Sequence, residues 1–198
     1  MSFSVLFVCI GNVCRSPFGE RLLRHRLDEL GIGDDYTVTS AGVRALRGRP
    51  MHPESARTLA ERGGSADGFV ARQLSSELAD GADLVLAATR DIRSRLLEDA
   101  PGSLRRAFTV REFVSLAEAH RAAGEGQSGA RAARPPAPDR SSALAKVVED
   151  CSRGRGILRL DDVDITDPIG RSPQTYDSVA ELMDEQVSRL AQVLHDPL

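Results

Sequence analysis

Hydrophobic residues alternate along the chain between short continuous runs and stripes of helical spacing. Continuous runs at 4–9, 37–41, 82–88 and 107–110 predict buried strands. Spacings of three to four residues predict helices at 16–30, 53–62, 90–97, 112–120 and 174–194. Strands that alternate with helices in this way favour a parallel sheet covered by helices on both faces.

The first predicted helix carries its own start and stop signals. Ser16 is a capping residue type, Pro17 suits a first turn, and Gly31 is typical of the position after the last turn. One side of this helix is apolar, and we expect it to face the core: Phe18, Leu22, Leu23, Leu27 and Leu30.

One stretch, at about 121–156, departs from the alternation. It is rich in Gly, Pro, Ala and Arg and includes GEGQSGARAARPPAPDR. We interpret it as a surface insertion with one short helix at 142–150, inside a single domain that spans 1–198. Docking of an anionic partner is the alternative role for it. Cys151 lies in this stretch and has no part in the predicted site.

Composition narrows the class of protein. The chain has 198 residues, of which 41% are hydrophobic, which suits one globular domain. The formal net charge of −3 disfavours a nucleic-acid-binding protein, and no apolar run is long enough for a membrane span. The N-terminus has no signal-peptide pattern, and three cysteines do not resemble a disulfide scaffold, so we expect a cytoplasmic location. No metal is predicted, because the four histidines lack ligand spacing and are interpreted as surface or helix residues: His25, His52, His120 and His195.

The candidate chemistry lies at the first strand-to-helix turn, VCIGNVCRSP at 8–17. Backbone N–H groups of a tight loop, together with the start of a helix, can bind an anion. Gly11 allows the loop to close, Asn12 tolerates left-handed backbone, and Arg15 offers a fork that matches phosphate oxygens. A thiol at position 9 lies in the same positive field, which favours the thiolate, and Ser16 can donate a hydrogen bond to it. The predicted anion-binding residues are Ile10, Gly11, Asn12, Val13, Cys14, Arg15 and Ser16.

This turn resembles the signature of the low-molecular-weight protein tyrosine phosphatases, V-C-x-G-N-x-C-R-S-P. Further segments agree with that family: SAGVRAL at 40–46, ARQL at 71–74, ADLVLAATR at 82–90 and DPIG at 167–170. The skew to Arg and Ala suits a bacterial member from a GC-rich, actinobacterial-type source. The resemblance implies a three-layer α/β sandwich of flavodoxin-like type with a four-stranded parallel sheet, and no metal or organic cofactor. It also implies hydrolysis of protein phosphotyrosine, with a phosphorylated protein or a bacterial tyrosine kinase as the partner.

The resemblance assigns three catalytic roles. Cys9 attacks phosphorus, Arg15 and the loop amides stabilise the phosphate oxygens, and Asp167 protonates the leaving phenol and then activates water. Asp164 is a minor alternative acid. Cys14 is either a small buried residue behind the loop or a redox partner that forms a reversible disulfide with Cys9.

Other functions of the same fold stay open. An arsenate reductase needs further downstream cysteines, which the region 82–99 lacks. A protein-arginine phosphatase resembles this chain but carries Thr where this chain has Val13. A non-catalytic phospho-binding module usually loses the nucleophile, the arginine or the acid, and all three are present here.

The chain is poor in aromatic residues, with six Phe, two Tyr and no Trp. Family members line the phosphotyrosine slot with aromatic side chains, some of them just after the Asp-Pro pair. Here Ile169 and Gly170 stand in those positions, and Tyr36 and Tyr176 are predicted to lie elsewhere. We therefore expect the substrate rim to be formed by Phe18, Leu46 or Ile169, or by the insertion.

Overall fold

Four parallel strands form the sheet at the centre of the protein. The structure is a computed structural model that describes residues 2–125, 137–156 and 162–197. The strands are β1 (Phe3–Cys9), β2 (Tyr36–Gly42), β3 (Leu84–Ala87) and β4 (Ala107–Thr109), in the order β2-β1-β3-β4. All four predicted strands are confirmed, with ends shifted by one or two residues. Because β1 lies between two neighbours, six of its seven residues are buried.

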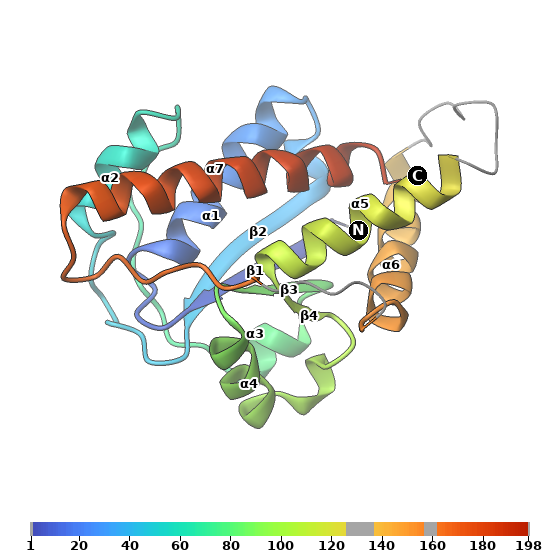
Figure 1. Ribbon diagram of the computed structural model, residues 1–198, viewed down its shortest axis with the longest axis horizontal. Coiled ribbons are helices and arrows are strands. Elements are labelled where there is room, and N and C mark those ends of the chain that lie inside the picture. Colours follow the sequence, from blue (N-terminus) through green and yellow to red (C-terminus); the bar gives the residue numbers. More distant parts are fainter. Residues whose placement is uncertain (1, 126–136, 157–161, 198) are drawn as a thin grey trace.

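Helices cover both faces of this sheet. They are α1 (Arg15–Glu29), α2 (Pro53–Ala60), α3 (Ser76–Asp80), α4 (Arg90–Asp99), α5 (Val110–Glu125), α6 (Ala137–Arg153) and α7 (Pro173–His195). In Figure 1, α1, α5 and α7 lie on one side of the strands, and α3 and α4 lie on the other. The three-layer prediction is confirmed. The short helix α3, with Ser75 as its N-cap, was not predicted.

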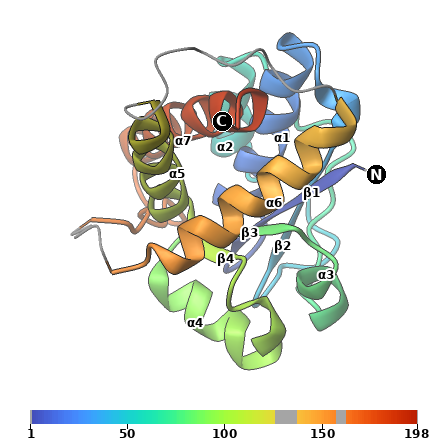
Figure 2. The ribbon, with the colours of Figure 1, turned by 90° about the vertical axis from the view of Figure 1, so that its right-hand side faces the viewer.

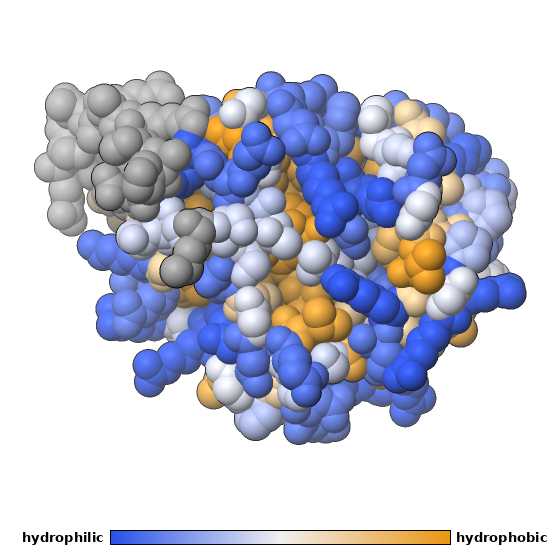
Figure 3. Space-filling model, turned by 180° about the vertical axis from the view of Figure 1, so that it is seen from behind, coloured by the Kyte–Doolittle hydropathy of each residue, from blue (hydrophilic) through white to orange (hydrophobic). Residues whose placement is uncertain are grey.

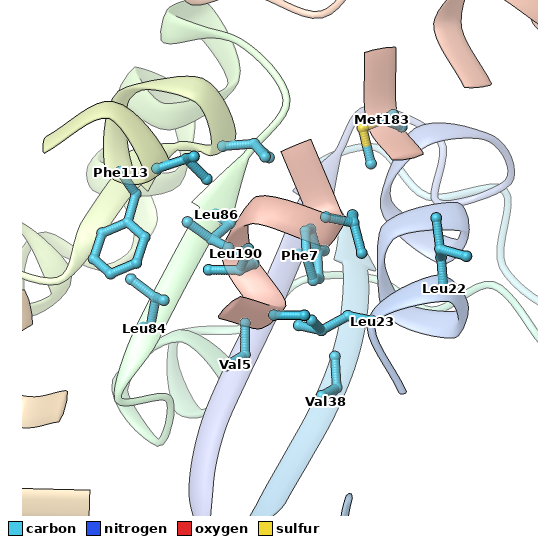
Figure 4. Packing of buried hydrophobic residues seen from close by; sticks show 14 of the residues in the cluster. Val5, Phe7, Leu22, Leu23, Val38, Leu84, Leu86, Phe113, Met183 and Leu190 are labelled. Atoms are coloured by element: carbon cyan, nitrogen blue, oxygen red, sulfur yellow. The ribbon is translucent and has the colours of Figure 1, made fainter. Parts of the chain in front are cut away.

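The alternation of side chains along β1 divides the core between the two faces. Val5 and Phe7 belong to the cluster under α1, α5 and α7, whereas Leu6 and Val8 belong to the cluster under α3 and α4. Figure 4 shows the first cluster, in which Phe7 lies near Leu23 of α1 and Leu190 of α7. The sheet is thus enclosed on both faces, and its carboxyl-terminal edge carries the first strand-to-helix turn.

The start of α1 differs from the prediction. The helix begins at Arg15 after Cys14, and no side chain caps it. Ser16 is already a helical residue, and its hydroxyl is turned into the preceding loop, where it contacts Cys9 and Asn12. Ser16 therefore supports the loop and is not a helix cap. The predicted end is confirmed, since the helix stops at Glu29 and Gly31 follows with a φ of 69°.

The stretch predicted as an insertion is more ordered and more buried than its composition indicates. Its predicted start at 121 falls inside α5, and the helix expected at 142–150 is the 17-residue α6. Four α6 side chains lie in the core: Leu144, Val147, Val148 and Cys151. Residues 140–153 are therefore not a surface connection, because the apolar face of α6 is part of the main core cluster. That the stretch is an insertion stays a prediction. The Pro- and Arg-rich part at 126–136 lies outside the described residues.

Helix α6 crosses the amino-terminal end of the sheet (Figure 2). Near its start, the buried Arg140 forms an ion pair with Asp35, which immediately precedes β2. Just after its end, Arg155 donates to the carbonyl groups of Leu104 and Ala107, at the start of β4. The Arg155 guanidinium also lies 3.9 Å from the centre of the Phe108 ring. The helix therefore joins the beginnings of the two outer strands.

Seen from behind, a band of hydrophobic side chains shows between hydrophilic ones (Figure 3). Among the described residues, no helix has the length and hydropathy that a membrane span requires.

Candidate active site

The loop between β1 and α1 turns its carbonyl groups outward. The carbonyls of Cys9, Ile10, Gly11 and Val13 accept hydrogen bonds of 2.8–3.0 Å from the backbone N–H groups of Val43, Arg44, Leu46 and His52. In a planar trans peptide the C=O and the following N–H point in opposite directions. The N–H groups of residues 10, 11, 12 and 14 therefore point into the loop, where they form a concave set of donors of the kind that binds oxyanions.

Asn12 holds the loop in this shape. Its φ of 54° makes it the one non-glycine residue of the described chain with left-handed backbone, and it is fully buried. Its side-chain amide donates to Ser16 and Ser40, at 2.9 Å each, and its carbonyl accepts from the N–H of Arg72 at 2.8 Å. Ser40 in turn donates to the buried Glu20 at 2.6 Å. Every polar atom of the Asn12 side chain is thus bonded to another element.

The close packing of β2 against the loop requires a glycine at position 42, whereas position 11 has room for a side chain. A Cβ at Gly42 would lie 2.5 Å from the Ile10 carbonyl oxygen and 2.9 Å from the Asn12 nitrogen, whereas a Cβ at Gly11 would make ordinary contacts of 3.5 Å or more. Gly42 also accepts from Leu74 and donates to Arg72 through its backbone. The SAG and ARQL segments of the sequence are therefore packed together against the loop, a role that motif reasoning did not assign.

Cys9 lies at the base of the loop, at the carboxyl end of β1, and is 2% exposed. Its Sγ accepts from the Asn12 N–H at 3.3 Å and lies 2.9 Å from the Ser16 hydroxyl. These two contacts fix the position of the sulfur at the base of the loop. The predicted Ser16 contact is present in the structure.

Arg15 is the first residue of α1 and is 4% exposed. Its Nη1 donates to the Ile165 carbonyl at 2.9 Å, and its Nη2 donates to the Asp167 carboxylate at 2.6 Å. Its Nε is buried and has no hydrogen-bond partner among the described residues. A buried guanidinium with an unpaired N–H is suited to an oxyanion ligand, because the bond to the ligand would satisfy that donor.

Asp167 is half-exposed at the mouth of the loop, and it also accepts from the Ile169 N–H at 3.3 Å. The neighbouring acids are occupied elsewhere. Asp164 accepts from the Arg90 backbone N–H at 2.7 Å, at the start of α4, and Asp162 pairs with Arg111. Asp161 lies outside the described residues. The structure thus brings Asp167 to Arg15 and ties Asp164 to a helix start.

Cys14 lies behind the loop, 3% exposed, next to Ser55 and Tyr176. Burial raises the pKa of the Cys14 thiol to about 11, with the nearby Cys9 and Asp167 acting in the same direction. His52, interpreted from sequence as a surface or helix residue, belongs to this group. It stacks on the Tyr176 ring, with centroids 4.9 Å apart, and its Nε2 lies 3.2 Å from the Tyr176 hydroxyl. Nothing in the His52 or Tyr176 spacing indicated this contact beforehand.

The rim of the loop is aliphatic. Leu46 and Ile169 are 51% and 45% exposed, and a Cβ at Gly11 would lie 3.7 Å and 3.9 Å from their side chains. Ile10 adds a third exposed apolar side chain. The prediction that Phe18 belongs to the rim is wrong: it is 3% exposed, because it lies one turn into α1 on the face that packs against the core. Tyr36 is also buried, and its hydroxyl donates to the Leu194 carbonyl.

No group of three or more potential ligands in the described residues is arranged to hold a metal ion. The polar groups that converge on the loop are backbone N–H groups, a thiol, a guanidinium and one carboxylate. This set defines a parallel α/β protein with an oxyanion-binding loop at the carboxyl end of its first strand.

The family profile described as low molecular weight phosphotyrosine protein phosphatase matches residues 4–125. The chain belongs to this family. It is 42% identical over 98 residues to the low molecular weight protein-tyrosine-phosphatase Etp of Escherichia coli K12, and 41% identical to Wzb of the same organism. The first alignment covers 50% of this chain and 62% of Etp, so the chain matches less than two thirds of that relative.

Solved structures share the fold over nearly the whole chain. The low molecular weight protein tyrosine phosphatase from T. tengcongensis superposes with a TM-score of 0.69 at 28% identity, covering 96% of this chain and 99% of that one. The YwlE arginine phosphatase from Geobacillus stearothermophilus gives a TM-score of 0.66 at 26% identity, covering 97% and 92%. Wzb from Escherichia coli K30, in complex with sulphate, has the same fold at a TM-score of 0.68 and 24% identity.

Proposed function

We propose that the protein hydrolyses phosphotyrosine in proteins or peptides through a cysteinyl-phosphate intermediate. The observation that carries this proposal is the convergence of Cys9, Arg15 and Asp167 at one loop. Cys9 Sγ lies within hydrogen-bond distance of the Ser16 hydroxyl. Arg15 Nη2 lies 2.6 Å from the Asp167 carboxylate. The names of Etp, Wzb and the T. tengcongensis enzyme support phosphotyrosine as the substrate.

In the first step, Cys9 Sγ attacks phosphorus and the bond from phosphorus to the phenolic oxygen breaks. The inward N–H groups of the loop and the Arg15 guanidinium bind the three phosphate oxygens, where charge develops. Asp167 gives its proton to the departing oxygen, so that phenol leaves and phosphate stays on Cys9.

In the second step, Asp167 removes a proton from water, and the resulting oxygen nucleophile attacks phosphorus. Cys9 leaves as a thiolate, which the Asn12 N–H and the Ser16 hydroxyl stabilise, and inorganic phosphate is released. No cofactor enters either step.

The other proposed activities differ in what they require. Arsenate reduction by a cysteine relay needs a further thiol near the loop, and the third cysteine, Cys151, is in α6 at the opposite end of the sheet. Phosphoarginine hydrolysis has a relative of known structure in the YwlE enzyme. Three unpaired cysteines suit a reducing compartment, so we also propose a cytoplasmic location, with a tyrosine kinase as a candidate substrate.

Steady-state kinetics on matched phosphotyrosine, phosphoserine and phosphoarginine peptides, with arsenate included, test the proposal. We expect turnover of phosphotyrosine, little of phosphoserine, and none by Cys9→Ser. Preferred turnover of phosphoarginine would instead indicate the arginine phosphatase activity. Binding without turnover by the wild-type protein would indicate a non-catalytic phospho-binding module.

A further inference from the structure

The loop that borders the phosphate-binding site carries three arginines and no acidic residue. Residues 43–50 read VRALRGRP, and we call them the arginine segment. Arg44, Arg47 and Arg49 are all exposed. The protein as a whole has a formal net charge of −3, so this local excess of positive charge is not a general property of its surface.

Within the described part of the chain, the side chains of these three arginines form no hydrogen bond or ion pair. Most arginines of the described chain contact a carboxylate or a carbonyl group, as Arg57 and Arg189 do. Five described arginines have no such side-chain contact: Arg44, Arg47, Arg49, Arg105 and Arg171. Four of the five lie in the two loops beside the candidate active site, since Arg171 follows the Asp167-Pro168 pair.

The arginine segment is fixed to the catalytic loop by its backbone. Arg44 and Leu46 donate to the Ile10 and Gly11 carbonyls at 2.9 Å each. Further along, Gly48 donates to the Ala71 carbonyl and Arg49 accepts from the Ala71 N–H. These hydrogen bonds fix the backbone from which the side chains of Arg44, Arg47 and Arg49 extend. All three arginines lie within three residues of the exposed Leu46 at the rim.

The opposite side of Arg44 has a different charge. A groove of about 420 Å³ runs from Val43 and Arg44 to α4, whose exposed face carries Asp91, Glu98 and Asp99. Arg95 pairs with Asp91 at 2.9 Å, so Glu98 and Asp99 are the carboxylates of this groove that form no ion pair among the described residues. The surroundings of the loop are thus basic along 44–49 and acidic at the carboxyl end of α4.

We propose that Arg44, Arg47 and Arg49 select substrates with acidic residues on one side of the phosphorylated tyrosine. This inference rests on the proposed phosphatase function. A peptide that places its phosphate in the loop must pass over the rim, where a carboxylate on one flank meets the unpaired guanidinium groups. An acidic residue that lies toward α4 instead meets the carboxylates of Glu98 and Asp99 and gains nothing.

Peptides with one phosphotyrosine and acidic residues before it, after it or on neither side test this inference. We expect kcat/KM to be about tenfold higher at low salt for one of the two acidic arrangements than for the neutral peptide, and the advantage to shrink as salt rises. Arg47→Glu and Arg49→Glu should each lower this ratio several-fold. Arg105→Glu makes the same change in net charge at an equally unpaired arginine near the start of β4, and it should keep the wild-type ratio.

Three outcomes would overturn the inference. The first is an equal kcat/KM for all three peptides, and the second is a ratio that Arg47→Glu and Arg49→Glu leave unchanged. The third is an equal loss of kcat/KM on all three peptides in these variants, which would indicate that the arginines attract the phosphate group itself. Phenyl phosphate separates this failure from that of the proposed function: a wild-type protein that hydrolyses phenyl phosphate but shows no preference contradicts only the inference, whereas one inactive on it contradicts both.

Discussion

Arg15 and Asp167, 152 positions apart in the chain, form an ion pair of 2.6 Å between Nη2 and Oδ2. The arginine is buried and the acid is half-exposed, so the pair places a carboxylate at the mouth of the loop and a guanidinium at its wall. A substrate phosphate that enters the loop meets both groups.

Replacement of Asp167 should slow the chemical step more than binding. We expect Asp167→Asn to lower kcat on phenyl phosphate by roughly 10²–10⁴-fold, which is the range typical of a lost general acid. The loss should be smaller on p-nitrophenyl phosphate, whose better leaving group needs less protonation. Asp164→Asn is the matched control, and an equal loss in that variant would contradict the role of Asp167.

Two substitutions at Asn12 separate backbone strain from lost hydrogen bonds. Asn12→Gly keeps the left-handed backbone available and removes three side-chain bonds, and we expect it to cost roughly 1–3 kcal/mol of unfolding free energy. Asn12→Ala loses the same bonds and adds strain at a φ of 54°, so it should cost about 1 kcal/mol more. Urea unfolding measures both, and equal stabilities would show that backbone conformation is not what selects asparagine here.

Gly42→Ala should damage oxyanion binding, because the added Cβ would meet the Ile10 carbonyl and the Asn12 nitrogen, both backbone atoms that cannot move independently of the loop. We expect inhibition by phosphate and vanadate to weaken at least about tenfold, the equivalent of about 1.4 kcal/mol. Gly102→Ala is the control, since its Cβ would meet only the Asp80 side chain, at 3.1 Å. Unchanged inhibition in Gly42→Ala would mean that β2 moves away without disturbing the loop.

The buried thiols predict a loss of stability at alkaline pH. Burial raises the pKa of Cys14 from 9.0 to about 11 and that of Cys151 to about 12. Above pH 9 the unfolded chain releases these protons and the folded protein retains them, so the unfolding free energy falls with rising pH. Each thiol contributes up to about 1.4 kcal/mol per pH unit. Urea unfolding at pH 8, 9 and 10 should give a shallower slope for Cys151→Ala than for the wild type, and parallel slopes would refute this contribution.

Mild peroxide should produce a Cys9–Cys14 disulfide. Oxidation of Cys9 gives a sulfenic acid, and attack by the Cys14 sulfur then forms the disulfide and releases water. Since the raised pKa keeps Cys14 protonated, the bridge should form faster as the pH rises from 7 to 9. Peptide mapping by mass spectrometry detects the bridge, and Cys14→Ala should accumulate sulfinic and sulfonic acid at Cys9. Sulfonic acid at Cys9 in the wild type, with no bridge, would exclude Cys14 as a redox partner.

The sequence predicts the sheet and the loop well because their signals are local. A buried strand, a tight turn and a helix start are continuous in the chain at 4–30, and they place Cys9 and Arg15 without further information. The role of Asp167 came from a resemblance, because no local pattern indicates that residue 167 lies beside residue 15. The same limit applies to the network of Asn12, Ser40 and Glu20, whose members come from three separate elements.

Composition is a poor guide to burial at two places. The scarcity of aromatic residues favours Phe18 as a rim residue, but its position on the buried face of α1 decides its exposure. The Gly, Pro and Arg around 140–153 favour a surface location with one short helix. The apolar spacing within that helix, which places Leu144, Val147, Val148 and Cys151 on one face, is the better guide to its burial.

The position of α6 affects how the outer strands of the sheet can unfold locally. The two outer strands of the sheet, β2 and β4, share no hydrogen bonds with each other. Arg140 of α6 contacts the residue before β2, and Arg155, two residues past the end of α6, contacts the first residue of β4. Separation of either strand from the sheet therefore breaks a contact at one end of the same helix. The amide protons of β2 and β4 should consequently exchange with solvent as one cooperative unit, at the cost of opening most of the domain.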